Sequence, residues 1–327
     1  MENHVFYEEI GHGSFSTVYK GRTKRTVEFV GIRRIERAHH SKAYTEVQAL
    51  HSLDHANVLK FHAWFATTNH VWVVTEYCAG GDLDTLIRQD GNLPEVTVLS
   101  FGLDVIAALI YVHSRGILAV DLRPPTLYIS EYGILKLADL GCACSIERPH
   151  GWDGQPFEAQ ERLVAMSTRA PSYVAPELLA RAGSHTLGSD CWAFGALLHE
   201  MAIGHPPFAP RNRAPEEVAH AVATKPAHPL PRNSETLNDL LRNMLAKNPA
   251  ARPSWPVLTD HSFWRGVAPR AAGHQQCHQQ HPRHSQHFSR SAPKGWCDGG
   301  EEPVSTVSEV PPPSWDGSTP PWDGPPP

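Results

Sequence analysis

The sequence has few of the residues on which small secreted and redox proteins depend. Only six cysteines occur in 327 residues, and none of them forms a C-x-x-C pair, so neither a zinc ribbon nor a dithiol redox motif is predicted. A chain of this length with so few cysteines is not a disulfide scaffold, and we expect it in a reducing compartment.

Long apolar runs and a strong excess of one charge are also missing. The longest apolar run, residues 105–112, is too short to cross a bilayer. The first residues show no basic segment followed by an apolar one, as a signal peptide would. A net charge of −5 gives no general attraction to nucleic acid or anionic lipid. We therefore expect a cytoplasmic protein without nucleic-acid or membrane partners.

The C-terminal residues differ in composition from the rest of the chain. Residues 265–327 contain no leucine, isoleucine, methionine or tyrosine but hold 12 of the 29 prolines. Such a segment cannot bury enough apolar area to offset its chain entropy. We predict a disordered Pro/His-rich tail over 266–327. The folded domain is predicted over 4–265, with a small lobe 4–76, a hinge 77–80 and a large lobe 81–265.

Two features of this tail each have a functional and a neutral interpretation. Histidines recur every three or four residues around Cys277, which indicates either a metal site or adventitious metal affinity. The tripeptide Trp-Asp-Gly begins at Trp152, Trp315 and Trp322, and a near-copy begins at Trp296. These copies are either docking motifs for a shared pocket or low-complexity drift.

Within the folded part, strand patterns come before helix patterns. Short β-rich runs predict strands over 6–13, 16–23, 26–35, 61–68, 70–78, 126–130 and 133–139. One helix is predicted over 41–53 and another over 189–204, where Gly204 and two prolines follow. A third helix is predicted to bury one face, formed by Leu99, Leu103, Ile106, Ala107 and Ile110. The fold class is therefore α+β, with a small β-rich lobe and a larger helical lobe.

Short motifs follow one another in a fixed order along this domain. The first, GHGSFSTV, contains Gly11, Gly13 and Val18, and its glycines let backbone N–H groups approach phosphate oxygens. The others are Glu46 on the first predicted helix, VDLRPPT at 120–126, ADLG at 138–141, YVAPE ending at Glu177, DCWAFG beginning at Asp190 and ARPSW around Arg252. As an ordered set these motifs resemble the bilobal protein kinase fold over its whole length.

Longer segments narrow the resemblance. VFYEEIGHGSFSTVYKGR, LHSLDHANVLKFHAW and EYCAGGDLDTLI are similar to the Runkel, fourth Unc-51-like kinase and Fused-like branch of the Ser/Thr kinases. The kinase domains of this branch are largely degenerate. The resemblance implies the bilobal fold, an ATP site between the lobes, and protein partners among microtubule, ciliary or cytokinetic components.

The resemblance implies which residues would hold ATP. They are Gly11, Gly13, Val18, Arg33, Glu46, Glu76, Cys78 and Tyr128. Arg33 replaces the phosphate-holding lysine and can pair with Glu46, and a purely structural ion pair is the alternative. Tyr128 replaces the leucine below the adenine, while Gly31 replaces the alanine above it. Tyr128 either accepts adenine or fills the pocket.

The resemblance also implies the residues of phosphoryl transfer. Asp121 stands at the position of the base, and Arg123 replaces the lysine that steadies the transferring phosphoryl group. Asp139 and Thr126 match the two Mg²⁺ ligands, of which Thr126 is the poorer because threonine replaces asparagine.

Two further replacements bear on activity. Val120 replaces the arginine that binds a phosphorylated activation segment, and Ala170 replaces a threonine that orients the substrate hydroxyl. Losses of this kind together favour negligible turnover. We therefore predict a pseudokinase that binds ATP weakly, with impaired Mg²⁺ binding, and that acts as a scaffold or regulator, in part on the cytoskeleton. The alternative is a weakly active Ser/Thr kinase that transfers the ATP γ-phosphate to protein hydroxyls.

Overall fold

The structure is a computed structural model in which part of the chain is described. The predicted tail beyond residue 266, with its histidines and Trp-Asp-Gly copies, lies outside the described residues, as does the copy at Trp152. The described residues are 3–13, 16–37, 40–147, 170–180, 184–208 and 214–266.

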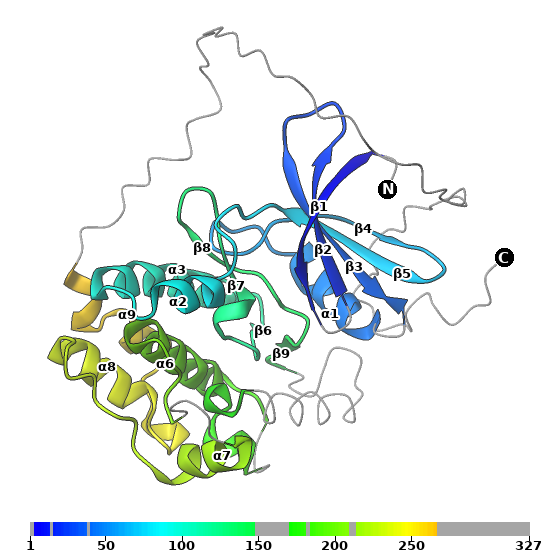
Figure 1. Ribbon diagram of the computed structural model, residues 1–327. Coiled ribbons are helices and arrows are strands. Elements are labelled where there is room, and N and C mark those ends of the chain that lie inside the picture. Colours follow the sequence, from blue (N-terminus) through cyan, green and yellow to red (C-terminus); the bar gives the residue numbers. More distant parts are fainter. Residues whose placement is uncertain are drawn as a thin grey trace, which may run out of the picture.

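The small lobe is an antiparallel sheet with one helix packed against it (Figure 1). The sheet order is β1-β2-β3-β5-β4. The elements are β1 (His4–His12), β2 (Ser16–Thr23), β3 (Phe29–Glu36), α1 (His40–His51), β4 (Phe61–Ala66) and β5 (His70–Glu76). Side chains alternate between the two faces, so Val71 and Val73 of β5 pack with Val47 of α1. Val74, on the other face, packs with Ile32 of β3.

The large lobe is mainly helical, as Figure 1 shows. Its helices are α2 (Leu83–Asp90), α3 (Glu95–Ser114), α5 (Pro176–Leu179), α6 (Leu187–Ile203), α7 (Pro215–Thr224), α8 (Glu235–Met244) and α9 (Trp255–Thr259). Two short strand pairs lie next to the small lobe. They are β6 (Ile117–Leu118) with β9 (Cys144–Ser145), and β7 (Leu127–Ile129) with β8 (Leu135–Leu137). The predicted α+β bilobal fold is therefore confirmed.

Helix α3 is buried differently from the prediction. Ile110, assigned to the buried face, is 42% exposed, whereas Val98, Val105 and Leu109 are buried. Leu99 and Ile106 of the predicted face are buried, so the prediction is wrong for Ile110 and incomplete for the other side of the helix, because α3 lies between other elements, including α6 and β8. By length and composition α3 could span a membrane, but half of its most apolar window is buried within the protein.

One apolar cluster joins the two lobes. It runs from Ala49 and Leu50 of α1 through Leu140 and Ala119 to α6. Helix α6 is almost wholly buried, and it ends at Gly204, whose φ of +83° favours glycine. The cluster fixes α1 and the loops around residues 119–126 and 139–141 to a common core, which positions the cleft between the lobes.

Candidate active site

The turn between β1 and β2 carries the predicted phosphate loop. Gly11 is paired with Val18 in the strand ladder, and the N–H of Gly13 donates to the carbonyl of Ser16 at 2.7 Å. A Cβ on Gly13 would lie 2.6 Å from Ser16 Oγ, too close for a side chain. A side chain here would have to displace the Ser16 hydroxyl, and without one the backbone stays accessible to a phosphate.

The replacement of lysine by arginine in β3 keeps an ion pair between the sheet and α1. Arg33 pairs with Glu46 of α1, as the sequence predicts, and the Glu46 side chain is only 4% exposed. A buried carboxylate of this kind needs its cation. Arg33 therefore holds α1 against the sheet and places positive charge where nucleotide phosphates are expected.

The hinge side chains are occupied by contacts within the protein. The Glu76 carboxylate accepts the N–H of Lys60 at 2.7 Å and pairs with Lys136 at 2.8 Å. Burial raises the pKa of the Cys78 thiol to about 12, with a further contribution from Glu76, so this thiol is neutral. A nucleotide at the hinge would therefore meet backbone groups rather than these side chains.

Tyr128 lies among the expected nucleotide-binding residues. It is in β7, bridged to Asp82, and its phenol interacts electrostatically with Arg33, Asp139, Asp82 and Cys78. Burial raises the pKa of this phenol, so it stays protonated. Its neighbours come from both lobes and from the hinge, which places the residue where the two lobes meet.

The residue above the adenine position is small for a steric reason. A Cβ on Gly31 would lie 3.3 Å from Thr75 Oγ1 and 3.5 Å from the carbonyl oxygen of Glu76. Thr75 of β5 is therefore the nearest neighbour of this position, and a side chain here would require Thr75 to shift slightly. The cleft combines a large residue on one side with the smallest possible residue on the other.

The carboxylate at the base position is held by an arginine. Arg123 Nε donates to Asp121 Oδ1 at 2.7 Å, and Nη2 donates to Oδ2 at 3.3 Å. Burial acts to lower the pKa of the Arg123 guanidinium, but its pairing with Asp121 outweighs this and raises it. Asp121 is buried, so its carboxylate is held in a fork-like contact.

The two expected metal ligands differ in their surroundings. The Thr126 hydroxyl lies 2.9 Å from the carbonyl oxygen of Asp121 and 2.8 Å from that of Arg123, and it accepts the N–H of Arg123. Thr126 is 1% exposed, so its hydroxyl forms its hydrogen bonds within the loop. Asp139 Oδ1 accepts the N–H of Gly141 at 2.9 Å. The phosphate end of the site fits a nucleotide, whereas the expected metal ligands among the described residues include one carboxylate, that of Asp139, and do not fit two Mg²⁺ ions.

The loop that carries Asp121 is held by hydrogen bonds to a residue of α6. Asp190 accepts the N–H groups of Ala119 and Val120 at 2.9 and 3.0 Å. His113 also contacts Asp190, at 2.8 Å, and no signal in the sequence indicated this histidine. The Val120 side chain packs with Leu118 and Cys144, so an apolar cluster replaces the expected basic group.

Glu177 and Arg252 form an ion pair within the large lobe. Arg252 donates to both carboxylate oxygens of Glu177 at 2.7 Å, and its side chain is 1% exposed. It also donates to the carbonyls of Gly188 and Ala246. The segment around Ala170–Glu177 is thereby tied to the large lobe.

A cavity of about 280 Å³ opens beside the loop, lined by residues that include Arg123, Ala170, Tyr173 and Glu200. Glu200 was not among the predicted site residues, although a glutamate within the apolar run of α6 was a visible signal. Burial raises the pKa of Glu200 to about 8, with Asp84 adding to the effect. Its Oε2 has no hydrogen-bond partner among the described residues.

Comparison with known proteins places this geometry in a family. The protein kinase domain matches residues 4–264. The chain is 39% identical to serine/threonine-protein kinase RUNKEL of Arabidopsis thaliana over 81% of its own length, and 36% identical to serine/threonine-protein kinase ULK4 of Mus musculus over 81%. It is 32% identical to serine/threonine-protein kinase 36 of Mus musculus, also over 81%.

The chain spans about a fifth of the length of each of these relatives, between 19% and 22%. The match covers both lobes and every site residue described above. The chain therefore belongs to the protein kinase domain family, in the branch that contains RUNKEL, ULK4 and serine/threonine-protein kinase 36.

Proposed function

We propose that this chain is a pseudokinase domain that binds ATP and acts through its fold, as a scaffold or regulator for protein partners. The observation that carries the proposal is the fork-like pair between Arg123 and Asp121. Both oxygens of the Asp121 carboxylate therefore already accept hydrogen bonds from one guanidinium. With the Thr126 hydroxyl engaged in the same loop, the side chains at the base position and at the second metal position both have partners within the protein.

Other features of the site support the proposal that the domain still binds a nucleotide. The open backbone of the glycine turn and the charge of Arg33 lie where phosphates are expected. ATP that binds only the folded state raises its stability by mass action. Asp139 is the residue that would hold a single Mg²⁺ ion through its carboxylate, and we propose no other side chain as a Mg²⁺ ligand.

The experiment pairs a thermal shift with a phosphotransfer assay, each with ATP in the presence and absence of Mg²⁺. We expect ATP to raise the melting temperature and no transfer to be detected. Arg33→Met should reduce the ATP-induced shift, whereas Asp90→Asn, at an exposed position, should leave it unchanged. Absence of any shift in the unaltered chain would contradict nucleotide binding.

A weakly active Ser/Thr kinase is the second candidate, favoured by the retention of both Asp121 and Asp139. Mg²⁺-dependent transfer to a protein substrate that disappears in Asp121→Asn would establish this function and reject the pseudokinase proposal. Transfer that persists in Asp121→Asn would indicate a contaminating kinase, and the preparation would have to be repurified before the proposal is judged.

For partners we propose microtubule, ciliary or cytokinetic proteins, with a cytoplasmic and cytoskeletal location. The support is the resemblance of this chain to its kinase branch. Cosedimentation of the full chain with assembled microtubules tests the first class. A chain that stays in the supernatant at saturating polymer would count against direct microtubule binding.

A further inference from the structure

A second cavity, of about 460 Å³, lies in the large lobe. Its apolar lining comes from Leu93 before α3, from Ala202 and Ile203 at the end of α6, and from Leu230 before α8. None of these residues belongs to the site between the lobes. The volume is within the roughly 300–1,000 Å³ typical of sites that accept a small ligand or a large side chain.

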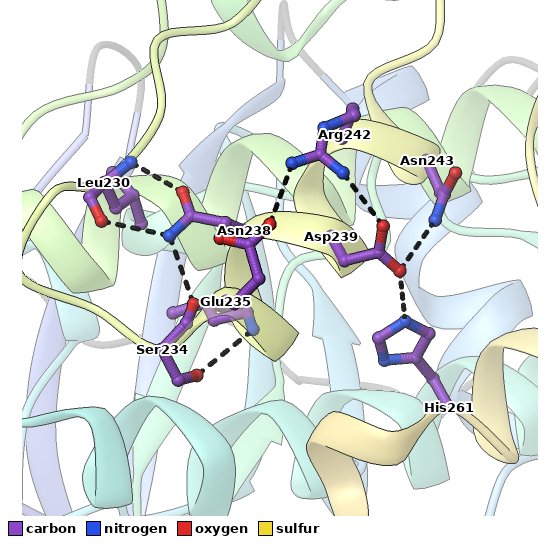
Figure 2. A network of polar contacts seen from close by, with 9 residues as sticks. Leu230, Ser234, Glu235, Asn238, Asp239, Arg242, Asn243 and His261 are labelled. Carbon is purple, nitrogen blue, oxygen red and sulfur yellow. Dashed lines mark hydrogen bonds and ion pairs between the residues drawn. The ribbon is translucent and has the colours of Figure 1, made fainter.

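The wall formed by residues 230–234 is held in place, as Figure 2 shows. Asn238 accepts the N–H of Leu230 at 2.7 Å and donates to the carbonyls of Leu230 and Ser234 at 3.0 and 3.1 Å. From the other side, the Glu95 carboxylate accepts from the Ser234 N–H at 2.8 Å and from the Asn233 side chain at 3.2 Å. The cavity is therefore preformed, with a loop fixed to both α8 and α3.

The charged residues at the cavity indicate which chemical groups a bound segment must carry. Glu95 has its hydrogen-bond donors within the protein. Burial acts to raise the pKa of Glu95, but the hydrogen bonds from Ser234 and Asn233 outweigh it and lower the pKa. Arg232 also lines the cavity and is exposed, and among the residues that the structure describes no carboxylate pairs with it. The complementary group is therefore an apolar side chain next to an acidic one.

The chain itself contains such a group outside the described residues. In the two copies of Trp-Asp-Gly at Trp315 and Trp322, an indole is followed directly by a carboxylate. Tryptophan offers a large apolar surface with little entropy to lose on docking. In the near-copy at Trp296 a cysteine separates the two groups, so the spacing differs.

The end of the described chain lies near the cavity. Trp264 packs against α3 so closely that a Cβ on Gly102 would lie 2.7 Å from its ring. Gly102 is seven residues from Glu95, or roughly 10 Å along the helix. If residues 267–314 behaved as a random chain, they would span roughly 35–40 Å, which is enough to reach the cavity from residue 266. Tethering would also raise the effective concentration of the docking group.

We propose that this cavity is a docking site for the Trp-Asp-Gly copies of the same chain, occupied by Trp315 or Trp322. The indole lies against the half-buried Ile203 and the exposed Pro231, and the following aspartate pairs with Arg232. This docking uses no residue of the nucleotide site, so it stands apart from the proposed function.

The test is hydrogen exchange of the full chain, read at the amides of residues 230 and 232–234 and at the start of α3. The double variant Trp315→Ala/Trp322→Ala should lose protection there, whereas Trp296→Ala, the matched control, should keep it. These substitutions lie outside the kinase domain, so a change in its folding does not confuse the result. Equal protection in the unaltered chain and the double variant would overturn the proposal.

A charge exchange tests the pairing with Arg232. Arg232→Glu, at an exposed position, should lose the same protection, and adding Asp316→Lys and Asp323→Lys should restore it. Failure to restore would reject the assigned pairing. Protection that falls as the protein is diluted would show docking between two copies, and that outcome would overturn the intramolecular proposal.

Discussion

The carboxylate of Asp190 accepts the backbone N–H of Val120 at 3.0 Å, and Val120 has a φ of +66°. This left-handed conformation costs roughly 1–2 kcal/mol for an ordinary residue, and a β-branched side chain fits it poorly. The same carboxylate also accepts the N–H of Ala119. Helix α6 therefore holds the catalytic loop in an unfavourable conformation, although other parts of the site have changed.

The first prediction is that Asp190→Asn destabilises the protein. Asparagine keeps the size but loses the charge, and hydrogen bonds to charged groups contribute about 1.5–3 kcal/mol. We expect the free energy of unfolding, measured by urea denaturation, to fall by about this amount. Asp260→Asn, at an exposed ion pair with Arg265, should change it by less than about 0.5 kcal/mol. Equal effects of the two substitutions would argue against the role given to Asp190.

The second prediction concerns the pair of Arg252 and Glu177. Arg252→Ala leaves a carboxylate in a mostly buried place, and breaking such a pair costs about 3–5 kcal/mol. We expect a marked fall in the melting temperature of the full chain. The double variant with Glu177→Leu removes the unpaired charge and should recover part of the loss. A double variant no more stable than Arg252→Ala would show that the charge is not the cause.

The third prediction is that Tyr128→Leu strengthens ATP binding. A smaller side chain gives the adenine more room below Gly31, so the thermal shift at a given ATP concentration should increase. Tyr128→Phe removes only the hydroxyl and should behave like the unaltered chain. If Tyr128→Leu binds ATP no better, the tyrosine does not restrict the site.

The fourth prediction concerns pH. Burial raises the pKa of Glu200 from 4.5 to about 8, so between these values the folded protein binds more protons than the unfolded chain. Stability therefore falls as the pH rises through this window, by at most about 1.4 kcal/mol per pH unit from this group. Glu200→Gln should be more stable than the unaltered chain at pH 8 and similar to it near pH 5. Parallel stability curves would rule out this contribution.

Local patterns predicted most of the elements because each depends on neighbouring residues. Alternating and β-rich runs indicated the five strands of the small lobe, and the glycine and prolines after residue 203 indicated the end of α6. The burial of α3 could not be predicted this way. Its periodicity favours one buried face, but α6 and β8 lie on different sides of it, and only packing decides which residues they cover.

The sequence by itself determined the kinase fold, the identity of the expected nucleotide-binding residues and the pair between Arg33 and Glu46. These follow from motifs whose order and charge are fixed along the chain. Only the tertiary structure decided that Arg123 engages Asp121, that the Thr126 hydroxyl serves its own loop and that Glu200 is buried beside them. A side chain's hydrogen-bond partners and its distance from water depend on atoms brought together by folding, and residue order does not encode them locally.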